Sequence, residues 1–313
     1  MAVYTAVTRS RLLSSRLARF ERTLAGIQRR EPEALHRARV ASRRLRELLP
    51  LLPSAKARKL RRRLGKVTAG LSAVRELDAM LPIIDERLPA PGAETLLLDH
   101  LRDAVMSARD EARTHLDERL TAGGLRRLTR KLGRLADEVA RAEESNAAEP
   151  RGRGWRWALD ARIARRGAQL ARAIRGAGAV YLPERLHDVR IAVKKLRYAM
   201  ELAGEAGRRA VGAELRLLKR SQDVLGRMHD LERLLDRART AQASLTPDQL
   251  SLSPALDGLV ASFEDECRRL HARYVRASGG LAALTEKLIA RQTGPARGRT
   301  GVGHLPARRA RVG

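Results

Sequence analysis

One fifteen-residue segment occurs twice in the chain, and this repeat constrains the fold more than any other feature. Residues 32–46 read PEALHRARVASRRLR and residues 183–197 read PERLHDVRIAVKKLR, with eight identical positions. A weaker echo follows, in which LSAVRELDAML from Leu71 aligns with LGRMHDLERLL from Leu225. Repeated segments of this kind indicate copies of one structural unit. We therefore expect an internally duplicated chain with two similar halves.

Helical periodicity extends through most of the sequence. Apolar residues recur at steps of three and four, Ala, Leu, Arg and Glu dominate, and runs of β-branched residues are absent. Pro- and Gly-containing segments predict the breaks, among them Pro53 and residues 89–92, 204–207 and 279–280. The pattern predicts an all-α fold of two similar helical bundles, with about five helices in each half.

Composition divides the chain into four parts. The segment 146–154 is rich in Gly, Pro and small polar residues, and we interpret it as a linker between a first half at 1–145 and a second half at 155–291. From residue 292 the chain is rich in Gly, Pro and Arg and lacks an apolar stripe. This pattern predicts a disordered basic tail at 292–313.

The charge balance points to an anionic partner. The chain carries 64 Lys plus Arg against 36 Asp plus Glu, which gives a formal net charge of +28 and a sequence pI near 11.5. Such self-repulsion favours an anionic ligand. Because 43% of the residues are apolar, the chain can also bury a sizeable core. A basic globular protein is expected, and a basic disordered chain is not.

Cysteine usage and hydropathy indicate a cytoplasmic protein. Cys267 is the single cysteine, so no intrachain disulfide can form and no Cys/His cluster offers a zinc site. Arginines interrupt the apolar positions near the N-terminus, so we expect no export signal. No window approaches the roughly 20 apolar residues that a membrane-spanning helix needs.

Each copy of the repeat predicts an amphipathic helix that begins at its proline. Successive residues advance about 100° around a helix, which separates an apolar side from a basic side in both copies. The apolar sides comprise Leu35, Ala38, Ala41, Leu45, Leu48 and Leu49, and then Leu186, Val189, Ala192, Val193, Leu196 and Met200. The basic sides comprise His36, Arg39, Arg43 and Arg46, and then His187, Arg190, Lys194 and Arg197.

Stacked cations on one helix side need a counterion. Glu47 is placed to pair with Arg43, but the equivalent second-half residue is Tyr198, so an external anion is the simpler explanation. Arginine suits phosphate because its planar fork donates two hydrogen bonds. The basic side of each repeat helix is therefore a candidate phosphate-binding surface. The helices that follow supply basic residues for a second wall of this site. The candidate anion-binding residues are His36, Arg39, Arg43, Arg44, Arg46, Arg62, Lys66, His187, Arg190, Lys194, Lys195, Arg197, Arg216, Lys219 and Arg220.

No pattern for catalysis is present in the sequence. Neither an activated nucleophile, nor a converging carboxylate pair, nor a metal cluster occurs at recognisable spacing. We therefore expect a binding protein without enzymatic activity, cofactor or bound metal. His36 and His187 fit phosphate contact or the ordering of neighbouring arginines better than metal ligation.

The repeated pattern of His, two residues, Arg, three residues, and then two basic residues followed by Leu and Arg resembles the CHAD family, the conserved histidine α-helical domain. RELD at residues 75–78 and HDLE at residues 229–232 are similar to its downstream motif, although His229 replaces the usual arginine. The resemblance covers most of residues 1–291. It implies two helical bundles related by a pseudo-twofold axis, and a central basic groove or pore that binds inorganic polyphosphate.

The resemblance also implies a stand-alone protein associated with polyphosphate or storage granules. The Glu-x-Glu-x-Lys motif of the triphosphatase domain that accompanies some family members is absent. Two alternatives stay open at this point. Non-specific, weak nucleic-acid binding would use the same electrostatics, although an aromatic content of 3% argues against base stacking. A granule scaffold would act through protein contacts. The sequence leaves the oligomeric state undetermined.

Overall fold

The computed structural model describes residues 7–52, 54–88, 93–145, 153–207, 211–243, 245 and 251–293. These residues form α-helices, turns and short 3-10 segments, and no β-strand occurs among them. The all-α fold predicted from the periodicity is confirmed. No helix within these ranges combines the length and apolar character needed to cross a membrane.

The helices divide between the two halves of the chain. The first half contains α1 (Arg9–Glu21), α2 (Leu24–Gln28), α3 (Pro32–Leu48), the 3-10 helix η1 (Leu49–Leu51), α4 (Ala55–Asp85), α5 (Ala93–Arg119) and α6 (Ala122–Ser145). The second half contains α7 (Arg153–Ala177), α8 (Pro183–Glu205), α9 (Gly212–Ala243) and α10 (Ser253–Thr293).

The two copies of the repeat form α3 and α8, and each helix begins at its proline. An acidic residue follows in each first turn, where it complements the positive end of the helix dipole. The apolar sides are buried as predicted, with Leu45 and Leu196 both 0% exposed. Burial of these sides fixes which way the basic sides of α3 and α8 face.

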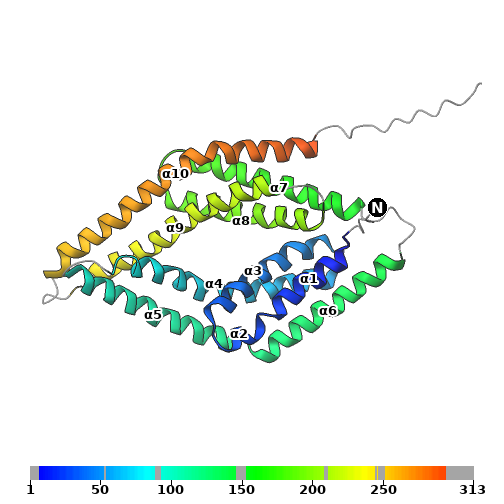
Figure 1. Ribbon diagram of the computed structural model, residues 1–313, viewed down its shortest axis with the longest axis horizontal. Coiled ribbons are helices and arrows are strands. Elements are labelled where there is room, and N and C mark those ends of the chain that lie inside the picture. The colour runs from blue at the N-terminus through cyan, green and yellow to red at the C-terminus, as the bar shows by residue number, and fades with distance from the viewer. Residues whose placement is uncertain are drawn as a thin grey trace, which may run out of the picture.

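Equivalent helices of the two halves make equivalent contacts. α3 packs on α4 as α8 packs on α9, and α1 contacts α3 as α7 contacts α8. Figure 1 shows the two groups lying one above the other, with α7 to α10 in the upper part and α1 to α6 in the lower part. Across the halves α3 contacts α8 and α4 contacts α9, and the buried apolar side chains form one continuous core. The pseudo-twofold relation stays a prediction.

Helix α10 departs from the expected helix count. The break predicted at Gly279 and Gly280 is wrong, because α10 runs through both residues. This helix packs on α9 and α7, whereas in the first half α5 packs on α4 and the separate α6 packs on α1. Contacts along both neighbours offset the weak helix propensity of two glycines.

The predicted boundaries fall mostly beside the gaps in the described residues. Ser145 ends α6 and α7 begins at Arg153, so residues 146–152 of the expected linker lie outside the described residues and its last two positions belong to α7. The first two residues of the expected tail end α10. Residues 294–313 lie outside the described residues, and their disorder stays a prediction.

Candidate anion-binding site

A pocket of about 560 Å³ lies between the two halves, where α3 and α4 face α8 and α9. We call it the inner pocket. Both motif helices supply basic side chains to it, and these come from the sides predicted to carry cations. The charged or histidine side chains that line it are His36, Arg39, Arg75, Glu76, Arg190, Lys194, Arg197, Lys219, Asp223, Arg227 and Asp230.

On the first-half wall, arginines meet a neutral oxygen. Arg39 donates from Nε to Ser72 Oγ at 3.1 Å, and Arg43 donates from Nη2 to the same oxygen at 3.4 Å. Ser72 lies on α4 and donates its own proton to the carbonyl of Thr68. Neither arginine forms an ion pair with an acidic residue in the described chain. These two arginines therefore keep their positive charge.

On the second-half wall, an acidic residue lies near the arginine. Arg190 lies 4.0 Å from Asp230 of α9, measured between Nη2 and Oδ1. Its Nε is buried without a hydrogen-bond partner. Lys194, which corresponds to Arg43 in the repeat, is 7% exposed and has no hydrogen bond or ion pair among the described residues. Buried cations without partners are costly and mark a place where an anion is expected.

The cations of the two halves lie close enough to perturb one another. Burial is the main cause that lowers the pKa of Arg39 to about 10, and Arg43, Arg190 and Arg75 lower it further. Burial also lowers the pKa of Lys194 to about 6, again with contributions from Arg190, Arg43 and Arg39. Residues from α3 and α8 thus belong to one electrostatic cluster.

The histidine of the first repeat contributes a neutral donor to the inner pocket. Arg75 of α4 donates from Nε to His36 Nδ1 at 3.3 Å. Because a guanidinium only donates hydrogen bonds, Nδ1 must accept, which places the ring proton on Nε2. Burial, Arg75 and Arg39 lower the pKa of His36 and favour this neutral form. His36 therefore offers an N–H group without adding charge.

The second histidine lies elsewhere, which corrects the prediction that both histidines face one channel. His187 contacts His229, with Nδ1 atoms 3.4 Å apart, and both line a separate pocket beside α9 and α10. Burial lowers the pKa of His229 to about 3, with Arg190 and His187 adding to the effect. His229 aligns with Arg75 in the downstream repeat, so this contact is the counterpart of the contact between Arg75 and His36.

Acidic residues of the interface gather in networks that join the halves beside the cation cluster. Arg227 of α9 pairs with Glu86 at 2.6 Å and with Glu266 at 2.8 Å, and Arg87 pairs with the same Glu266. Elsewhere Arg44 of α3 pairs with Glu201 of α8 at 3.0 Å. These pairs hold the halves together and leave Arg39, Arg75 and Lys194 of the inner pocket without an ion pair among the described residues.

Glu47 does not serve as the counterion of Arg43. It is buried against α7, where it pairs with Arg162 and lies 3.8 Å from Arg166. The position of Glu47 on α3 allowed pairing either with Arg43 or with a basic residue of another helix, because the sequence does not say which helix covers this part of α3. The pairing leaves Arg43 to the cation cluster, where it lowers the pKa of Arg39 and Lys194.

The remaining predicted residues separate into three groups. Arg197 and Lys219 line the inner pocket, although Arg197 also pairs with Glu201. Arg46 lies near Gly65 of α4 with its Nε buried and unpartnered. The others lie outside the inner pocket: Arg44 and Lys195 line two further pockets, and Arg62, Lys66, Arg216 and Arg220 are exposed.

Several residues of the inner pocket were not among the predicted binding residues. Arg75 and Asp230 come from the downstream repeat, which the sequence comparison had already aligned. That alignment was the available signal, because equivalent positions of both halves converge on one interface. Within the described residues, no group of three or more His, Cys, Asp and Glu side chains is arranged to hold a metal ion. Cys267 is buried.

Comparisons with known proteins agree with this architecture. The CHAD domain of the plant Ricinus communis superimposes with a TM-score of 0.59 and 23% identity, covering 87% of this chain and 94% of that one. PptA from Streptomyces chartreusis superimposes with a TM-score of 0.53 and 20% identity, covering 86% of this chain and 97% of that one.

These similarities establish the fold. No curated protein sequence matches the chain significantly. The sequence profile of the CHAD domain matches residues 11–239, which include both copies of the repeat and both downstream motifs. The chain belongs to the CHAD domain family.

Proposed function

We propose that the chain binds inorganic polyphosphate in the inner pocket. One observation carries the proposal: Arg39, Arg75 and Lys194 line the pocket from both halves, Arg43 lies close enough to lower the pKa of Arg39 and Lys194, and none of the four has an ion pair among the described residues. A phosphate chain supplies closely spaced negative charges and acceptor oxygens along its whole length. Membership of the CHAD domain family supports this ligand, since the family resemblance implies polyphosphate binding.

The dimensions of the pocket favour a linear phosphate chain over a nucleic-acid duplex. A volume of about 560 Å³ between packed helices is that of a small-molecule site. A duplex, whose major groove alone is about 12 Å wide, would not enter it. Tyr198 is the one Phe, Tyr or Trp side chain in the described lining of the inner pocket, and it is buried beneath Arg197, so single-stranded bases find no stacking platform.

We further propose that the protein acts by binding alone, in the cytoplasm and at polyphosphate granules. Among the described residues that line the inner pocket, no nucleophile lies beside an activating base. Incubation with long-chain polyphosphate should leave the chain-length distribution on a gel unchanged. Progressive shortening of the polymer by purified protein would overturn the proposal of a non-enzymatic role.

Replacing Arg39, Arg43, Arg190 and Lys194 together by Ala tests the site. We expect polyphosphate affinity to fall by about 100-fold or more, because each charged hydrogen bond contributes on the order of 1.5–3 kcal/mol. The matched control replaces Arg62, Lys66, Arg216 and Arg220 by Ala, which removes the same number of basic side chains from exposed positions. Equal losses in the two variants would show that overall charge, and not the inner pocket, binds the polymer.

Two further measurements separate the alternatives. Unlabelled duplex DNA should fail to displace labelled polyphosphate at equal phosphate concentration and salt, and effective displacement would favour non-specific nucleic-acid binding. In cells, a fluorescent fusion of the inner-pocket variant should leave polyphosphate granules. Retention at granules would favour a scaffold that acts through protein contacts.

A further inference from the structure

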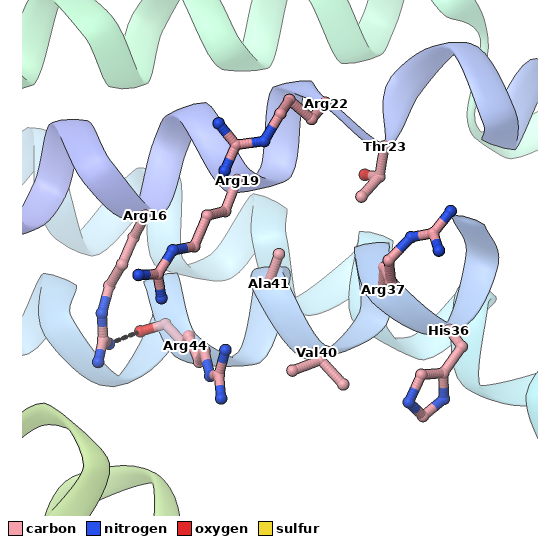
Figure 2. A pocket seen from close by; sticks show the side chains of 9 residues that line it. All are labelled: Arg16, Arg19, Arg22, Thr23, His36, Arg37, Val40, Ala41 and Arg44. Carbon is pink, nitrogen blue, oxygen red and sulfur yellow. Dashed lines mark hydrogen bonds between the residues drawn. The ribbon is translucent and has the colours of Figure 1, made fainter. Parts of the chain in front are cut away.

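A second cationic pocket lies on another side of α3, facing α1. Its volume is about 440 Å³, close to that of the inner pocket. Figure 2 shows Arg19 reaching from α1 toward α3, while Val40 and Ala41 lie on α3 between Arg44 and Arg37. We call it the outer pocket. It is lined by Arg16, Arg19, Arg22, Thr23, His36, Arg37, Val40, Ala41 and Arg44.

Cations outnumber acidic partners in the outer pocket. Arg16 and Arg19 share Glu205, at 2.9 and 3.6 Å. Arg16 is 1% exposed, and its Nη2 has no hydrogen-bond partner. Arg22 has no ion pair among the described residues, and Arg37 lies 3.9 Å from Glu33 in an exposed pair that contributes little. The arrangement leaves guanidinium groups free for an anion.

The second half contains a matching pocket with less positive charge, in which Arg172, Arg185 and Lys195 are the basic side chains. It lies between α7 and α8, has a volume of about 340 Å³, and is lined by Ile191, Ala192 and Lys195 at the positions of Val40, Ala41 and Arg44. Here Asp188 stands where the outer pocket has Arg37, and α7 supplies Gln169 and Arg172 with the spacing of Arg16 and Arg19. The helix packing thus does not require the five arginines of the outer pocket.

His36 connects the two cationic pockets of the first half. It lines the inner pocket and the outer pocket, and its Nδ1 accepts from Arg75 of the inner pocket. A phosphate chain bound in the inner pocket would meet Arg37, Arg19 and Arg22 once it passed His36. Two sites on the protein that hold the same polymer chain strengthen binding, because the second site binds a chain that the first site already holds.

We infer that the outer pocket is a second binding site for phosphate oligoanions, and that a long polyphosphate chain occupies both pockets by passing over His36. This inference rests on the proposed function. The shared chemistry is a run of phosphate groups, which guanidinium groups bind with paired hydrogen bonds. The pocket between α7 and α8 has fewer cations and an acidic residue in its lining, and it is not part of this path.

Calorimetric titration with tripolyphosphate tests the inference. Wild-type protein should bind two molecules per chain, and replacement of Arg19, Arg22 and Arg37 by Ala should leave one. The variant with Arg39, Arg43, Arg190 and Lys194 replaced by Ala should also bind one, at the outer pocket. Combining both sets should abolish binding. Failure of the proposed function and failure of this inference are distinguishable, because the inner site and the outer site are removed in different variants and the stoichiometry of each is measured separately.

Long-chain polyphosphate provides a second readout. The outer-pocket variant should bind it about tenfold more weakly, and the dependence of log affinity on log salt should be shallower by about 2. The matched control replaces the exposed Arg126, Arg127 and Arg130 of α6 by Ala. A loss as large in this control as in the outer-pocket variant would overturn the inference, as would unchanged stoichiometry in the outer-pocket variant. Gln at the same three positions replaces Ala if circular dichroism reveals misfolding.

Discussion

The two copies of the repeat share one helix geometry but balance their charge differently. In the first half Arg39 and Arg43 meet the neutral hydroxyl of Ser72, whereas in the second half Arg190 faces the carboxylate of Asp230. Packing is reproduced because the apolar sides of α3 and α8 must both be buried. The pairing of these basic side chains is not reproduced, because Arg39 and Arg43 have no ion pair among the described residues, while Arg190 lies near both Asp230 and Glu76.

Placing an acid beside Arg39 and Arg43 should have the largest effect. In Ser72→Asp a carboxylate would lie between Arg39 and Arg43 and act as an internal counterion. We expect polyphosphate affinity to fall about thirtyfold, which corresponds to roughly 2 kcal/mol, and the protein to become more stable. The measurement is a fluorescence titration at fixed salt beside the neutral control Ser72→Asn. Equal polyphosphate affinity of the Asp and Asn variants would contradict the claim that an internal counterion weakens binding.

Removing the buried lysine should separate stability from binding. In Lys194→Met an apolar chain of similar length replaces a cation that burial disfavours. We expect the free energy of unfolding at pH 7 to rise by roughly 1–3 kcal/mol, while polyphosphate affinity falls about tenfold. Urea unfolding and the same titration measure the two quantities. A variant that is less stable than the wild type would show that Lys194 has a structural partner in the protein.

The same lysine predicts a pH dependence of stability and binding. Its pKa in the folded protein, about 6, lies below its ordinary value of 10.5, so the unfolded chain binds the proton more tightly. The free energy of unfolding should therefore rise with pH across this window. Bound phosphate raises the pKa of Lys194, so binding takes up a proton, and affinity should increase about fivefold from pH 8 to pH 6. In Lys194→Met, the free energy of unfolding and the polyphosphate affinity should lose most of this pH dependence.

Removing the acid of the second-half wall should have the smallest effect and the opposite sign. In Asp230→Asn, Arg190 loses its nearby carboxylate and becomes available to phosphate. We expect polyphosphate to bind about threefold more tightly, and the free energy of unfolding to fall because Arg190 is buried. Weaker polyphosphate binding by a folded variant would mean that Asp230 positions Arg190 for the ligand.

Local sequence was enough to predict the helices of the motif and their buried sides. Pro32 and Pro183 start α3 and α8, and the apolar stripe from Leu35 to Leu48 is buried as its spacing requires. Such features depend on residues within a few turns of one another. The continuous α10 was missed because contacts with α7 and α9 outweigh the two glycines.

The partners of the basic side chains depend on which helices face each other, which spacing alone does not give. Glu47 pairs with Arg162 of α7 and not with Arg43, and His187 turns to His229 outside the inner pocket. The helical periodicity contained one signal that the prediction of binding residues did not use. Arg37, Val40, Ala41 and Arg44 recur at steps of three and four and mark the wall of the outer pocket.

A crystal structure of the chain bound to a short polyphosphate would test the site most directly. We predict phosphate oxygens within hydrogen-bonding distance of Arg39 and Arg43 on one side and of Lys194 on the other, between the two halves. Phosphates bound at Arg62, Lys66, Arg216 or Arg220, with none between α3 and α8, would contradict a shared site built by the two repeats.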